Sequence, residues 1–180
     1  TITDNESAST VTLTTSATSI AENAGSSLTL TATIGTATYQ DVTVSLDGTG
    51  GTATEGTDFG TVSDITISAG ATTGTASFTP TDDSIYDATS NETAGISISA
   101  VSGGSATEDG NQAVTITITD NESAPTVTLS RSSSAIDENS GSTVTITATL
   151  SVVTFQDVTV SIDGTGGTGT EGTDFGTVSD

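Results

Sequence analysis

The chain has 180 residues, with 23 acidic side chains and one basic side chain, so its formal net charge is −22. It contains no His, Cys, Met or Trp, which excludes thiol chemistry, zinc sites built from His or Cys, and catalytic Ser–His pairs. One Arg cannot line a groove for nucleic-acid phosphates. No apolar run is long enough to span a bilayer. We therefore expect no nucleic-acid partner and no direct membrane insertion.

Alternation of apolar and polar residues marks the expected strands. Leu30, Ala32 and Ile34, for example, alternate with threonines, and this period of two is typical of a strand with one buried face. The abundant Thr, Val and Ile residues favour the same conformation. In chain order, strands are predicted near 10–14, 27–34, 41–47, 64–69, 75–80, 95–101 and 112–119. No window has helical spacing, so we predict an all-β, antiparallel, seven-stranded sandwich.

The chain also repeats itself with a period of 116 residues. When residues 1–64 are aligned without gaps to residues 117–180, 46 positions are identical. A period of this length is typical of one domain per repeat. We predict the end of a preceding repeat and a linker in 1–9, a complete domain in 10–122, and the N-terminal half of a second repeat in 123–180. The half repeat lacks four strands, so we expect either that the chain is part of a longer array or that another chain completes it by strand addition.

The acidic side chains are unevenly distributed over the expected loops. If the strands run up and down, the first, third and fifth loops and the exit of the last strand lie at one end of the sandwich. That end carries nine carboxylates: Glu22, Glu55, Asp58, Asp82, Asp83, Asp87, Glu92, Asp120 and Glu122. The other end carries three: Asp41, Glu108 and Asp109. Because nearby carboxylates repel each other and no base is available, we expect Ca²⁺ there, which accepts six to eight oxygen ligands more flexibly than Mg²⁺ does.

Four motifs in this order resemble the Calx-beta domain, a module of sodium–calcium exchangers and of large bacterial surface proteins. The first is Ile20–Gly25, with its Glu-Asn pair, and the second is the Gly-rich loop Gly51–Phe59. The third is Asp82–Asp87, followed by an Asn-Glu-Thr triplet, and the fourth is the closing strand Ile116–Glu122. Together they extend over the complete first repeat, and the second repeat contains counterparts of the first two.

The resemblance implies an immunoglobulin-like sandwich with calcium at the acid-rich end. The ligands it implies in the first repeat are the side chains of Glu22, Asp58, Asp82, Asp83, Asp87, Glu92, Asp120 and Glu122, the carbonyl of Ile85, and Asn121 within the acidic triplet. In the second repeat the corresponding ligands are Glu138 and Asp174.

The function expected from this combination is structural rather than enzymatic. The chain is expected to form part of a calcium-stiffened stalk or filament of a secreted or cell-surface adhesion protein, extracellular and bacterial, whose partners are neighbouring repeats and other copies in a filament. Three alternatives stay open: a regulatory calcium sensor, a repeat that binds a ligand on another cell, and repeats that assemble between chains by strand completion.

Overall fold

A computed structural model describes residues 8–87 and 91–178. Most of the linker expected in 1–9 therefore lies outside the described residues. The chain divides into two compact units, the first formed by residues 1–83 and 89–121 and the second by residues 84–88 and 122–180. Within the described ranges, no helix is both long and apolar enough to cross a membrane.

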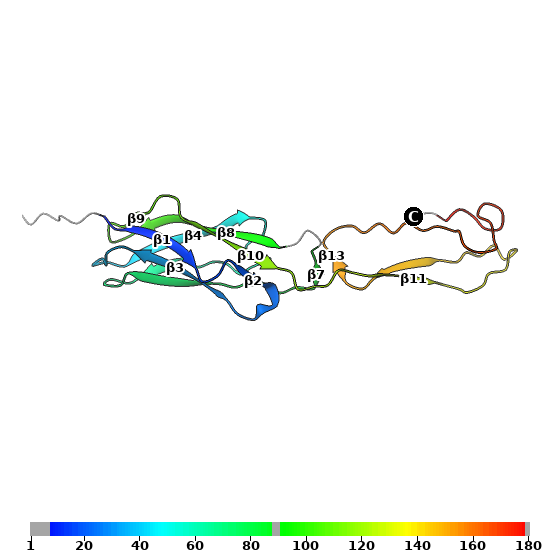
Figure 1. Ribbon diagram of the computed structural model, residues 1–180, viewed down its shortest axis with the longest axis horizontal. Helices are drawn as coiled ribbons and strands as arrows, with labels where there is room; N and C mark the ends of the chain where they lie inside the picture. Colours follow the sequence, from blue (N-terminus) through cyan, green and yellow to red (C-terminus); the bar gives the residue numbers. More distant parts are fainter. Residues whose placement is uncertain (1–7, 88–90, 179–180) are drawn as a thin grey trace, which may run out of the picture. The chain divides into compact units, whose positions relative to one another are not determined.

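The first unit is built from two β-sheets that enclose one hydrophobic core (Figure 1). One sheet has the strand order β6–β3–β1–β9 and the other has the order β2–β10–β8–β4–β5. The strands are β1 (Thr10–Thr15), β2 (Ser19–Ala21), β3 (Leu28–Ile34), β4 (Val42–Gly51), β5 (Ile65–Ile67), β6 (Thr73–Phe78), β8 (Glu92–Ser102), β9 (Thr107–Glu108) and β10 (Ala113–Thr119). A short 3₁₀ turn, η1 (Glu22–Ala24), follows β2.

These sheets contain nine strands, whereas the sequence predicted seven. The two additional strands are β2 and β9, which pair in parallel with β10 and β1 respectively. Each has only two or three residues, which is too short for alternation to be recognised. The remaining pairings in the two sheets are antiparallel.

Burial in the first unit follows the alternation of the sequence. In β3 the side chains of Leu30, Ala32 and Ile34 are buried, and the threonines between them are not. The largest core side chains are Phe59 and Phe78, both fully buried, with ring centroids 4.9 Å apart. Tilted aromatic pairs at this separation stabilise a core beyond the area that they bury.

The second unit has little core of its own. It contains β11 (Val127–Arg131) paired with β12 (Ile146–Leu150), and β13 (Val153–Thr154) paired with β7 (Ile85–Tyr86). Leu129 is 58% exposed, although its counterpart one period earlier, Leu13, is 5% exposed. The difference arises because residues 123–180 include no counterparts of β8 and β10, the strands that help to cover this face in the first repeat.

Candidate metal centre

The parallel pairing of β2 with β10 brings two distant carboxylates to the same end of a sheet. Ile20 is paired with Ile118 and Ala21 with Thr119. The next residue in each strand direction is acidic, Glu22 after β2 and Asp120 after β10. Parallel strands keep their register, so Glu22 and Asp120 leave the sheet side by side although 98 positions separate them.

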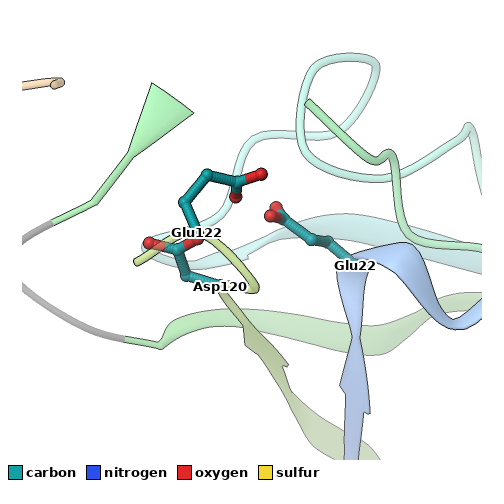
Figure 2. A group of neighbouring side chains, drawn as sticks. All are labelled: Glu22, Asp120 and Glu122. Carbon is teal, nitrogen blue, oxygen red and sulfur yellow. The ribbon is translucent and has the colours of Figure 1, made fainter. Parts of the chain in front are cut away.

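Glu22, Asp120 and Glu122 form the acidic cluster of this end. One carboxylate oxygen from each lies within 4.8 Å of the other two, and each side chain is half-buried. Figure 2 shows Glu22 pointing from the end of β2 toward the side chains of Asp120 and Glu122, which follow β10. The backbone amide of Asn121 donates a hydrogen bond to Glu22 Oε1 at 3.3 Å, which holds the Glu22 carboxylate against the segment after β10.

The carboxylates of the acidic cluster repel one another when all three are ionised. Two unit charges 4.8 Å apart repel by about 1 kcal/mol in water and by about 3.5 kcal/mol at an effective dielectric constant of 20. Three ionised carboxylates make three such pairs. The only basic side chain of the whole sequence is Arg131. Carboxylate oxygens that converge in this way are the ligand type that a hard divalent cation such as Ca²⁺ prefers.

The three cluster members are a subset of the ligands expected from the sequence. Glu92 begins β8 directly opposite Ile118, so it lies at the same end of the sheet but outside the group of three. Asp82 and Asp83 are exposed in the segment between β6 and β8 and are also outside that group. Among the described residues, the acidic cluster is thus the part of the predicted ligand set that the fold assembles.

Asp58 has a structural role in its loop. Its Oδ2 accepts a hydrogen bond from the Thr54 amide at 2.6 Å, which closes the turn after the Gly-rich segment. In the second repeat Asp174 accepts from the Thr170 amide at 2.7 Å in the same way. A Thr and an Asp four residues later are the sequence signal for this turn, because short acidic side chains bond nearby backbone amides.

The other expected ligands belong to the second unit. Ile85 lies in β7, and Asp87 follows that strand. Glu138 is exposed in a turn, whereas its counterpart Glu22 is half-buried. This contrast has the same origin as the exposed apolar face, since residues 123–180 contain no counterpart of β10 beside which Glu138 could lie.

Comparison with known protein families agrees with this architecture. The model of the Calx-beta domain matches residues 4–122 and again residues 120–180, two adjacent segments that together extend over nearly the whole chain. No curated protein sequence matches the chain significantly. Calx-beta domains are non-enzymatic β-sandwich modules, and the family is associated with calcium binding. The chain belongs to the Calx-beta domain family, whose pattern it matches in two adjacent segments, the second about half as long as the first.

Proposed function

We propose that this protein is a calcium-binding structural repeat that forms part of a stiffened stalk or filament of a secreted or cell-surface adhesion protein. The observation that carries the proposal is the acidic cluster, where one oxygen from each of three carboxylates lies within 4.8 Å of the others. No lysine or histidine exists in the chain to neutralise them. A bound cation relieves their repulsion and so stabilises the folded repeat.

The place of the acidic cluster along the chain supports a mechanical role. Asp120 and Glu122 flank Asn121 directly after β10, in the segment that leads from the first repeat into the second. An ion held by both residues restrains the backbone between them. Pro125 limits the same segment further, since its φ angle is fixed. Calcium thereby stiffens the connection between consecutive repeats in this proposal.

An extracellular location fits such a site. Calcium sites of extracellular modules typically have dissociation constants of about 10⁻⁴–10⁻³ M, and a small set of half-buried carboxylates is compatible with this range. The neighbours in the proposed stalk are further copies of the same repeat, and copies in other chains where the stalk forms a filament.

Thermal unfolding of the full chain tests the calcium site. The first unit is expected to gain about 2.7 kcal/mol when Ca²⁺ is present at 100 times its dissociation constant. For a domain of this size, that gain raises Tm by about 10 °C. Mg²⁺ is expected to give a much smaller shift, because it requires a tighter octahedral set of ligands.

The matched variants are Glu22→Gln combined with Asp120→Asn, and Asp109→Asn as the control. Asp109 is an exposed carboxylate in the loop between β9 and β10. The double variant is expected to lose the Ca²⁺-dependent shift, and the control is expected to retain it. If the wild-type chain melts at the same temperature with and without Ca²⁺, the acidic cluster is a solvated surface and the proposed calcium site is wrong.

Stiffening is tested separately by small-angle X-ray scattering of the full chain. Ca²⁺ is expected to narrow the distribution of distances between the two repeats in the wild type but not in the double variant. Binding in the micromolar range with a large change of shape would instead favour a regulatory sensor. Calcium binding with an unchanged distance distribution would refute the mechanical role and leave the ion site in place.

A further inference from the structure

The second unit contains a parallel strand pair whose members come from different repeats. β13 (Val153–Thr154) belongs to the second repeat, and β7 (Ile85–Tyr86) comes from the segment between β6 and β8 of the first. Val153 is paired with Ile85 and Thr154 with Tyr86. The amide of Phe155 donates a hydrogen bond to the Tyr86 carbonyl at 3.2 Å. A segment of one repeat thus adds a strand to the next repeat along the chain.

The first repeat contains the same receiving segment one period earlier. Residues 37–39 are the counterparts of residues 153–155. In the first repeat the Thr38 hydroxyl donates to the Gln40 carbonyl at 2.6 Å, and in the second repeat Thr154 donates to the Gln156 carbonyl at 2.6 Å. The two segments therefore share their local conformation, and both present the same backbone edge.

That backbone edge is unoccupied among the described residues of the first repeat. Successive residues of an extended strand direct their amide and carbonyl groups to opposite edges. The Thr38 carbonyl accepts a hydrogen bond from the Gly70 amide at 2.8 Å. The edge of the segment that carries the Thr38 carbonyl therefore faces the first repeat itself. The neighbouring groups of Ala37 and Tyr39 consequently point to the other edge, where the described part of the chain supplies no hydrogen bond to the Tyr39 amide.

The groove beside this edge is lined by uncharged residues although the chain has a net charge of −22, and the carboxylate of Asp41 at its border accepts a hydrogen bond from the Ala69 amide. The side chain of Tyr39 is fully exposed. It borders an open groove lined only by uncharged residues, including Gln40, Gly70 and Gly104. The segment Ser84–Tyr86 is uncharged as well, so the residues that would pair along this edge carry no charge, and the flanking carboxylates of Asp83 and Asp87 lie just beyond them.

We propose that residues Ala37–Tyr39 of the first repeat form a docking edge for the Ile85–Tyr86 segment of another copy of this repeat, which adds there as a parallel strand. The inference is carried by the β7–β13 pair, in which the equivalent edge of the second repeat receives this same segment. Consecutive repeats are then joined by a backbone ladder in addition to their covalent linker. The ladder itself requires no ion from the acidic cluster of Glu22, Asp120 and Glu122, although its donated segment includes Ile85 and adjoins Asp87, two of the calcium ligands that the family resemblance implies.

Amide hydrogen exchange measured by NMR tests the proposal, first on the 180-residue chain. The Phe155 amide is expected to exchange at least about tenfold more slowly than the Tyr39 amide, because only the former is paired. Tyr86→Pro alters the donated strand by removing its amide, and it is expected to abolish the protection of Phe155. Tyr86→Val keeps the amide and is the matched control. Protection of the Ile96 amide in the core, unchanged in both variants, shows that the domain stays folded.

The decisive measurement uses a longer chain in which an additional copy of residues 7–122 precedes Ser7. The new junction keeps the first two residues of the natural one, because Glu122 is followed by Ser123 and Ala124 just as Glu6 is followed by Ser7 and Ala8; Ser9→Pro at the new junction supplies the counterpart of Pro125. The additional copy supplies a donor segment, so the Tyr39 amide is expected to become at least about tenfold more protected. Tyr86→Pro in the additional copy is expected to reverse this gain.

The same exchange rates measured in EDTA and in Ca²⁺ separate this proposal from the proposed function. Protection of Tyr39 in EDTA supports the docking edge even if no calcium binds. If Tyr39 exchanges equally fast in the original and the extended chain, or if Phe155 is unprotected in the original chain, the docking edge is wrong, whatever the outcome of the calcium experiments.

Discussion

Replacing Glu22 with Gln is expected to change stability in opposite directions with and without calcium. Without a divalent ion, Glu22 repels the carboxylates of Asp120 and Glu122, which lie within 4.8 Å. Gln removes this charge, while its carbonyl oxygen can still accept the hydrogen bond from the Asn121 amide. The variant is therefore expected to be more stable than the wild type in EDTA. In Ca²⁺ it lacks one charged ligand and is expected to gain less from the ion.

The magnitude follows from the geometry of the acidic cluster. The Glu22→Gln substitution eliminates two of the three repulsive pairs, each of about 1 to 3.5 kcal/mol at 4.8 Å for dielectric constants of 80 and 20. Because the side chains are half-buried rather than enclosed, the lower end applies, and we expect a gain of about 2 kcal/mol in EDTA. A tenfold weaker calcium affinity would reduce the Ca²⁺-dependent gain from about 2.7 to about 1.4 kcal/mol at 100 times the wild-type dissociation constant.

The assay is urea unfolding followed by circular dichroism, in EDTA and in Ca²⁺ at constant ionic strength, because screening alters the repulsion between exposed charges. Asp109→Asn provides the control for a general change in net charge. The reasoning is refuted if Glu22→Gln destabilises the protein in EDTA, or if the EDTA effect equals that of the control. An identical response of variant and wild type to Ca²⁺ would show that Glu22 is not a ligand.

Two further predictions test the packing and one exposed carboxylate. Phe59→Ala is expected to destabilise the first unit by about 3–5 kcal/mol in urea unfolding, whereas Phe175→Ala, at the equivalent position but 37% exposed, is expected to change stability by less than about 1 kcal/mol. Equal effects would contradict the assignment of the core. Hydrogen bonds from the Thr49 side chain and then from its amide lower the pKa of Asp47 below 3.8. This depressed pKa stabilises the fold at pH values above 3.8, and the contribution is lost as the pH falls through the folded-state value. Thr49→Val is expected to raise the Asp47 pKa toward 3.8 in an NMR titration, and an unchanged pKa would exclude the hydroxyl as a cause.

The sequence was sufficient for the long strands because each combines two independent signals. In β3 the apolar residues Leu30, Ala32 and Ile34 occupy alternate positions, and the threonines between them also favour extended backbone. The short strand β2 carries no such signal. Its three residues become a strand because β10 offers a free edge in parallel register, and pairing of this kind depends on the tertiary fold rather than on local preference.

The candidate site was predictable in part, because the long strands fix which loops lie at the same end of the sandwich. Sorting the loops by strand direction placed Glu22 and Asp120 at one end of the sandwich, and the β2–β10 register brings them into one cluster. The Gly-rich loop illustrates the limit of this approach. Asp58 closes its own turn through the Thr54 amide, and the presence of an acid in the sequence does not distinguish a backbone-capping carboxylate from one that faces an ion.

Comparison of the two repeats distinguishes what the local sequence determines from what the neighbouring strands contribute. Leu13 and Leu129 occupy equivalent strand positions, yet one is 5% and the other 58% exposed. Alternation fixes which face of the strand is apolar, and the presence of facing strands decides whether that face is buried. The edge formed by residues 153–155 follows the same logic, since its turn is local but its partner strand comes from the preceding repeat. In this chain the segment that pairs with β13 comes from the first repeat, so the β13 edge is occupied only because another repeat precedes it.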